Sequence, residues 1–192
     1  PAVVGAIVLL ICQLLTALAV VREREIGTLE QLMVSPLRPA ELIAGKMIPF
    51  ALVGLFDVGL ITAVARLWFH VPFMGSPALY VLASLLFLLS WLGMGLLLST
   101  LSSTQQEAFM ASFLVFMPTM LLSGFMFPVR SMPALFQVIT LLNPLRHYLE
   151  IVRALFLKGA GLGALWPQYL ALLVMGVTRV VVAGSRFHKR ST

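Results

Sequence analysis

The acidic residues of this chain, which could bind protons, metal ions or a partner protein, are unevenly placed. Four of the seven, Glu23, Glu25, Glu30 and Glu41, lie between positions 23 and 41. Asp57 lies inside a long apolar stretch, where a charged group costs about 2.5–3.5 kcal/mol on insertion scales. Carboxylates at such positions are typical of partner binding at a membrane face or of an ion site within the membrane.

Sequence motifs of common enzymes are absent. No G-x-x-x-x-G-K-[ST] loop occurs, because Gly45-Lys46 lacks both the earlier glycine and the hydroxyl residue. There is no H-E-x-x-H or G-x-S-x-G motif, and the three histidines are scattered. Cys12 is the single cysteine, so the chain cannot form a disulfide or a Cys-based metal site by itself. We therefore expect no ATP hydrolysis and no cofactor on this chain, which disfavours a membrane-embedded enzyme.

The composition is that of a membrane protein. Hydrophobic residues make up 60% of the chain and charged residues 10%, with a mean hydropathy of +1.04, whereas soluble domains contain about 25% charged residues. The net charge of +6 would suggest nucleic acid as a partner of a soluble protein. Here we interpret the excess of Lys and Arg as a record of membrane orientation, with the lipid bilayer and not nucleic acid as partner.

Five apolar segments are long enough to cross the membrane, which takes roughly 20 residues for about 30 Å of hydrocarbon. They are Pro1–Val21 and about Leu42–Ala65, Ala78–Leu101, Ala108–Phe127 and Ala164–Gly184. The pattern predicts an all-α polytopic membrane protein in which residues 1–192 form one transmembrane domain. Gly93 and Gly95 would let another helix approach the third segment closely. The first segment begins without methionine or a basic leader, so we expect a piece of a longer protein rather than a signal peptide.

Residues 22–40 separate the first two apolar segments. Gly27 suits a bend after the first segment, and Thr28 with Gln31 has the spacing of a capping box. Leu29, Leu32 and Met33 would share one helical face, and Pro36 would end this helix. Pro39 and Glu41 suit the start of the next helix. This pattern predicts a short amphipathic helix on the membrane surface.

Residues 128–163 are apolar but interrupted by Pro128, Pro133 and Pro144. Neither half, Pro133–Leu142 or Pro144–Leu157, is long enough to cross the membrane. Segments of this length are typical of a re-entrant or interfacial pair of helices.

Two blocks of residues resemble the type-2 ATP-binding-cassette (ABC) transporter permeases. The first is Glu23-Arg24-Glu25-x-Gly27-Thr28-x-Glu30-x-Leu32-x-x-x-Pro36, followed by Glu41-Leu42 and Gly45-Lys46-x-x-Pro49. The second is Gly124-x-x-Phe127-Pro128, Met132-Pro133, Asn143-Pro144-Leu145 and Tyr148. The resemblance covers nearly the whole chain and implies that a first span, and often a sizeable outer domain, precede it in the full-length protein.

The resemblance also implies how the chain works. Residues 22–40 would be the coupling helix that docks into an ABC ATPase subunit, with Glu23, Arg24, Glu25, Gly27, Thr28, Glu30, Leu32 and Pro36 as the candidate coupling residues. ATP-Mg would be bound by that partner. Two permeases, as a homo- or heterodimer, would form the export path in the bacterial plasma (inner) membrane. Residues 128–163 would form an outer re-entrant hairpin, whose Pro128, Pro133 and Pro144 are candidate exit residues.

The expected topology places residues 21–41 and the C-terminal tail in the cytoplasm. The basic residues on that side, including the ends of the spans, would be Arg22, Arg24, Arg38, Lys46, Arg179, Arg186, Lys189 and Arg190. Those outside would be Arg66, Arg130, Arg146, Arg153 and Lys158, so the positive-inside bias is moderate.

An ion-coupled secondary transporter is the alternative function, with Asp57 and Glu107 as its candidate ion sites. Asp57 could lie on the transport path or could be a structural partner for a polar group on a neighbouring helix. The sequence does not name a substrate, although the apolar spans lean toward an amphipathic or hydrophobic compound.

Overall fold

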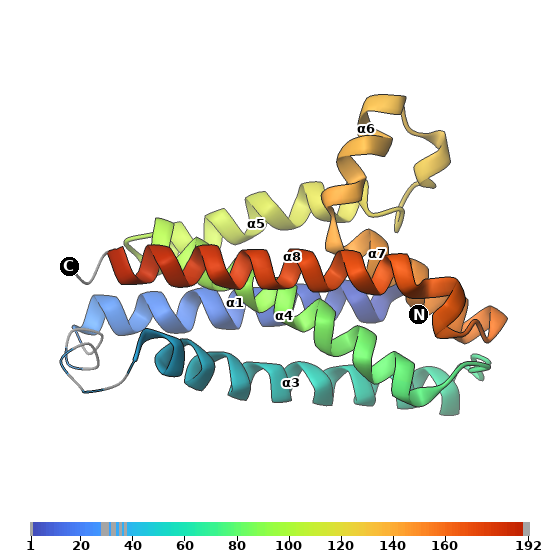
Figure 1. Ribbon diagram of the computed structural model, residues 1–192, viewed down its shortest axis with the longest axis horizontal. Coiled ribbons are helices and arrows are strands. Elements are labelled where there is room, and N and C mark those ends of the chain that lie inside the picture. The colour runs from blue at the N-terminus through green and yellow to red at the C-terminus, as the bar shows by residue number, and fades with distance from the viewer. Residues whose placement is uncertain (1, 28–30, 32–33, 35, 37, 190–192) are drawn as a thin grey trace.

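The protein is a bundle of long helices in its computed structural model, which describes residues 2–27, 31, 34, 36 and 38–189. Five helices run along the longest axis of the molecule (Figure 1). They are α1 (Ala2–Ile26), α3 (Pro39–Leu67), α4 (Pro77–Leu101), α5 (Gln105–Leu122) and α8 (Leu162–Lys189). No strand occurs in the described residues, which confirms the all-α class.

Three helical stretches are long and apolar enough to cross a membrane, namely Ala40–Leu67, Pro77–Leu101 and Leu162–Arg186. They confirm a polytopic membrane protein, while the role of α1 and α5 as spans stays a prediction. The expected fourth span, Ala108–Phe127, was wrong at its C-terminal end. Helix α5 stops at Leu122, and Gly124 follows with a φ of +84°, a left-handed conformation that ends a helix.

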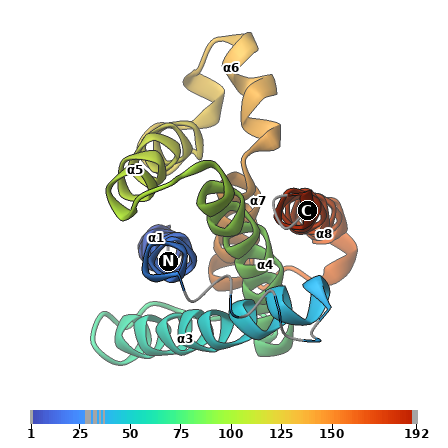
Figure 2. The ribbon, with the colours of Figure 1, turned by 90° about the vertical axis from the view of Figure 1, so that its left-hand side faces the viewer.

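Helix α4 occupies the centre of the bundle (Figure 2), where its buried side chains include Phe87, Trp91 and Leu92. A Cβ on Gly93 would lie 3.1 Å from the Cβ of Arg179 on α8. On the opposite helix, a Cβ on Gly176 would lie 3.1 Å from Leu89 Cδ2. These reciprocal glycines let the two helices approach closely, as we predicted for Gly93.

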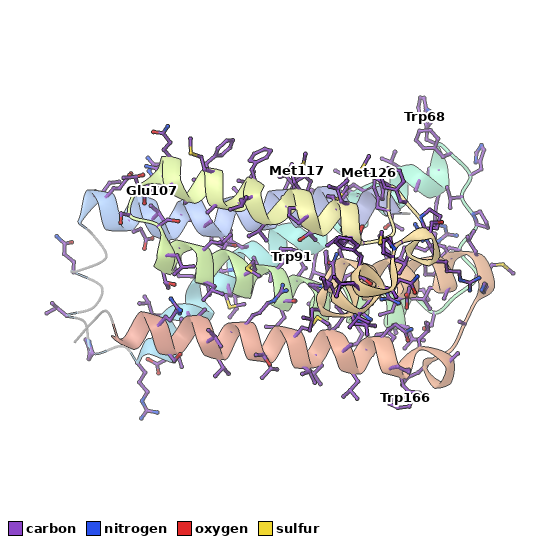
Figure 3. All side chains as sticks on the ribbon, turned by 90° about the horizontal axis from the view of Figure 1, so that it is seen from above. Trp68, Trp91, Glu107, Met117, Met126 and Trp166 are labelled. Atoms are coloured by element: carbon purple, nitrogen blue, oxygen red, sulfur yellow. The ribbon has the colours of Figure 1, made fainter. Side chains whose placement is uncertain are left out.

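Aromatic side chains mark one end of the bundle. Trp68, in the loop between α3 and α4, and Trp166, near the start of α8, lie toward the same end (Figure 3). Both are largely exposed. Tryptophan is enriched where a membrane meets water, so this end fits an interface.

Short helices fill the region between α5 and α8. They are η1 (Val129–Ser131), α6 (Ala134–Ile139), η2 (Thr140–Leu142), α7 (Pro144–Arg153) and the π-helical turn η3 (Ala154–Lys158). None is long enough to span. Helix α6 stands away from the bundle (Figures 1 and 2), whereas α7 is packed into it, with Leu145, Tyr148 and Ile151 fully buried.

Candidate functional site

The acidic end of α1 contacts two neighbouring helices. Helix α1 continues to Ile26, five residues beyond the expected end of the first span, so Glu23 and Glu25 lie on its last turns. Glu23 forms an ion pair with Lys46 of α3. Glu25 accepts two hydrogen bonds from Gln105, at 2.9 Å from the backbone N–H and 2.7 Å from the side-chain amide. Three helices are therefore joined at this end through two carboxylates.

Glu25 also serves the start of α5. Gln105 is the first residue of that helix, and the first backbone N–H groups of a helix have no partner within it. Two hydrogen bonds from Gln105 lower the pKa of Glu25 below its ordinary value of 4.5, and the side-chain bond has the larger effect. The carboxylate form of Glu25 is therefore the one that links α1 to α5.

The Glu25–Gln105 link should make the stability of this end depend on pH. A folded-state pKa below 4.5 means that the link stabilises the fold above about pH 4.5 and is lost as the pH falls through the folded-state value. We expect the melting temperature of the purified protein to fall more steeply from about pH 5 to about pH 3 in the wild type than in Glu25→Gln. Gln105→Ala, which keeps the backbone donor, should lie between the two. Equal slopes for all three proteins would contradict the assignment.

The chain bends at the start of the predicted coupling segment and begins a new helix at its end. Gly27, directly after α1, has a φ of +82°, which agrees with the predicted bend. At the other side, the backbone N–H of Arg38 donates to Glu41 Oε2 at 3.1 Å, and α3 starts at Pro39. This agrees with the predicted restart, so residues 22–26 and 39–40 of the expected segment belong to the long helices.

The structure does not describe all of the candidate coupling residues. Thr28, Glu30 and Leu32 lie outside the described residues, as does the side chain of Arg24. Pro36 is exposed. The amphipathic helix and its docking role therefore stay predictions.

Asp57 lies in α3 and is half-buried. Its Oδ2 atom is buried and has no hydrogen-bond partner within the described part of the chain. The role of Asp57 as a structural partner for a polar group on a neighbouring helix stays a prediction. A place on the transport path stays a prediction.

The three candidate exit prolines each stand at the start of a short helix. Pro128 precedes η1, Pro133 precedes α6, and Pro144 is the first residue of α7. Proline is well suited to a helix start, since it has no N–H to leave unpaired. The observed positions explain the prolines structurally, and their role in export stays a prediction.

Asn143 is a structural residue whose role the sequence analysis missed. Its Oδ1 accepts from the backbone N–H of Leu145 at 3.0 Å and so caps α7. Its Nδ2 donates to the carbonyl of Thr119 on α5 at 2.8 Å. An asparagine directly before Pro144 is a recognisable N-cap signal, but the tie to α5 is visible only in the fold.

Tyr148 joins α7 to the central helix. Its ring stacks on Phe87 with centroids 4.3 Å apart, and its hydroxyl lies 3.0 Å from Ser84 Oγ. The Tyr80 hydroxyl, on α4 like Ser84, lies 2.9 Å from Thr62 Oγ1 of α3. These polar contacts lie in the first half of α4, which begins at Pro77, and the sequence alone did not indicate them.

Comparison with known proteins gives the family of the chain. Residues 1–157 match the family described as ABC-2 type transporter. The chain belongs to this family. Its match includes α1, the segment after Gly27 and α3 to α7, so both blocks of the resemblance lie within it. Nothing in this family membership favours the ion-coupled alternative.

Three proteins with similar sequences align with most of this chain. "Probable multidrug ABC transporter permease YbhR" of Escherichia coli K12 is 38% identical over 190 residues, which is 99% of this chain and 52% of YbhR. "Inner membrane transport permease YhhJ" of the same strain is 34% identical over 176 residues, 91% of this chain and 47% of YhhJ. "ABC transporter G family member 20" of Dictyostelium discoideum is 26% identical over 171 residues, 88% of this chain and 23% of that protein. The chain thus spans about half the length of the bacterial relatives it matches.

Proposed function

We propose that this chain is the membrane part of a permease subunit in an ATP-driven exporter of the bacterial inner membrane. The observation that carries the proposal is the family match over residues 1–157. A separate ABC ATPase would bind ATP-Mg and hydrolyse it, and a second permease would complete the path. Amphipathic or hydrophobic compounds would be the cargo, in keeping with the word "multidrug" in the name of YbhR.

One end of the bundle is suited to an ATPase partner. The C-terminal end of α1, the α4–α5 connection and the C-terminal end of α8 all lie there (Figure 1). Basic residues at this end include Arg22, Arg38, Lys46 and Arg186, and Lys and Arg are enriched on the cytoplasmic side of membrane proteins. We therefore assign this end, and with it the C-terminus, to the cytoplasm.

The contacts at this end suggest how force would reach the membrane. Closure of the ATPase on ATP would move residues 28–37, which are joined directly to α1. Helix α1 is tied to α3 by Glu23 and Lys46 and to α5 by Glu25 and Gln105. A push on the coupling segment would therefore move three helices together and convert an inward-open path into an outward-open one.

Cysteine labelling and co-purification would test this function. Ser76 and Ser103 are both exposed and flank the two ends of α4. In a cysteine-free full-length protein, we expect Ser76→Cys to react with an impermeant maleimide in intact cells. Ser103→Cys should react only after permeabilisation, and the tagged protein should retain an ABC ATPase on purification.

The opposite labelling pattern would invert the topology and remove the ATPase from the proposed docking end. Purification without any ATPase, under conditions that preserve the permease fold, would contradict the exporter proposal itself.

A further inference from the structure

Arg179 is a cation inside a predicted membrane span. The sequence analysis counted it among the cytoplasmic basic residues at the ends of spans, and that side stays a prediction. It lies within the span Leu162–Arg186, and its guanidinium turns toward α4, where Nη1 donates to Ser90 Oγ at 3.3 Å. Helical side chains point back toward the N-terminus of their helix, which here carries the charge away from the nearby end of α8.

The contacts of Arg179 fix its depth. Ser90 and Trp91 lie near the middle of α4, which runs from Pro77 to Leu101. Trp91 likewise lies between the end with Glu107 and the end with Trp68 and Trp166 (Figure 3). A guanidinium that could reach water along its own helix is instead held near mid-membrane height, where ionisable groups usually mark a functional site.

The positive charge of Arg179 is not neutralised by the described residues. Its guanidinium carbon lies 5.4 Å from the centroid of the Trp91 ring, a cation–π contact. No carboxylate of the described residues forms an ion pair with it. Trp91 itself is 1% exposed, and its indole N–H has no hydrogen-bond partner among those residues. Two donor groups with unused capacity therefore lie side by side in an apolar setting.

A cavity of about 180 Å³ adjoins both side chains. Helices α4, α5, α8 and the α6–α7 region contribute to its walls, and its lining includes Trp91, Pro118, Thr119, Asn143 and Arg179. The amide nitrogen and oxygen of Asn143 are already engaged. Pockets for whole drug-sized molecules are about 300–1,000 Å³, so this cavity is suited to one end of a molecule.

We propose that Arg179 and Trp91 form an intramembrane binding site for the anionic group of an amphipathic molecule, such as a carboxylate, sulfonate or phosphate. The planar guanidinium donates paired hydrogen bonds to such a group, and the indole N–H supplies a further donor. The apolar tail lies among the helices or in lipid. The interpretation of the bound molecule as cargo rests on the proposed transport function, whereas binding itself does not require ATP.

A matched pair of probes can test the site. The fluorescent compound 11-(dansylamino)undecanoic acid and its methyl ester differ only in the carboxylate. We would titrate each into the full-length permease–ATPase complex in phosphatidylcholine nanodiscs without nucleotide. Arg179→Gln should weaken binding of the acid by about 10- to 100-fold, the usual range for a charge-assisted hydrogen bond, and leave binding of the ester unchanged.

Three further variants separate charge from packing. Arg186→Gln removes an exposed arginine from the same helix and should leave binding of the acid unchanged. Trp91→Phe keeps a ring beneath the guanidinium but removes the N–H. It should weaken binding of the acid by about 2- to 10-fold. Arg179→Lys keeps the charge, so it should bind the acid more tightly than Arg179→Gln. If Arg179→Gln fails to fold, Trp91→Phe compared with the wild type still decides the matter.

Lipid composition identifies the occupant. If the site holds an anionic phospholipid, phosphatidylglycerol in the nanodisc should compete with the acid in the wild type but not in Arg179→Gln. If it holds the anionic group of cargo, phosphatidylglycerol should have no effect. The proposed site would be overturned if the wild type and Arg179→Gln bound the acid equally. It would also be overturned if Arg179→Gln lost binding of the acid and of the ester to the same extent. A wild-type complex that binds the acid but shows no ATP-driven export would instead contradict the proposed function.

Discussion

Gly27→Pro is expected to abolish stimulation of the partner ATPase by transported compounds. Gly27 has a φ of +82°, whereas the ring of proline holds φ near −65°, so the chain could not leave α1 in its present direction. Residues 28–37 would then be displaced from the position in which we propose that they dock to the ATPase. We expect the variant to insert and fold, because none of the residues that the structure describes lies within 4 Å of the position of a Cβ on Gly27. The measurement is ATP hydrolysis by the reconstituted complex with and without cargo.

A graded series at Gly27 isolates the backbone effect. Gly27→Ala adds no clash but disfavours the left-handed conformation by about 1–2 kcal/mol, so coupling should be reduced. Gly27→Asn should be closer to the wild type, because asparagine adopts this conformation more readily than other residues. Normal coupling in Gly27→Pro would show that the bend does not transmit force. Glu30→Lys, which changes charge in the predicted docking helix, should also abolish coupling while leaving the bend intact.

Tyr148→Ala is expected to produce the largest loss of stability, about 3–5 kcal/mol, the usual range for removal of a buried aromatic side chain. Tyr148 is fully buried, stacks on Phe87 and contacts Ser84 through its hydroxyl. Its loss would leave a cavity between α7 and the central helix. Denaturant unfolding of the purified protein, followed by the near-UV signal, measures the change.

Two milder variants separate the ring of Tyr148 from its hydroxyl. Tyr148→Phe keeps the stack on Phe87 and removes one hydrogen bond, at a cost of about 0.5–1.5 kcal/mol. Ser84→Ala removes the other partner of the same bond. If the bond is the only coupling between them, the double variant should cost less than the sum of the two. A loss below about 1 kcal/mol for Tyr148→Ala would contradict a core role for α7.

Several features of this protein could be derived from local sequence, because their causes are local. Apolar runs of about 20 residues predict membrane helices wherever they occur. Pro39 and Pro144 start helices because their missing N–H is not needed there, and Gly27 bends the chain because it lacks a Cβ. The family was recognisable from two blocks of residues, since both have fixed spacing along the chain.

Other features depended on residues far apart in sequence. The partner of Glu25 is Gln105, so no pattern near residue 25 could show that α1 continues to Ile26 to join α5. Asn143 reaches Thr119 on α5, and Tyr148 of α7 stacks on Phe87 of the central helix.

Arg179 shows the difference between the two kinds of information most clearly. In sequence it is a basic residue near the end of the last span, which suggests a cytoplasmic anchor. In the fold, the close packing of α4 and α8 around Gly93 and Gly176 brings its guanidinium to Trp91. The sequence alone determined that a charge lies in α8, and only tertiary packing decided that it faces the interior, because the direction of a side chain depends on which helix lies beside it.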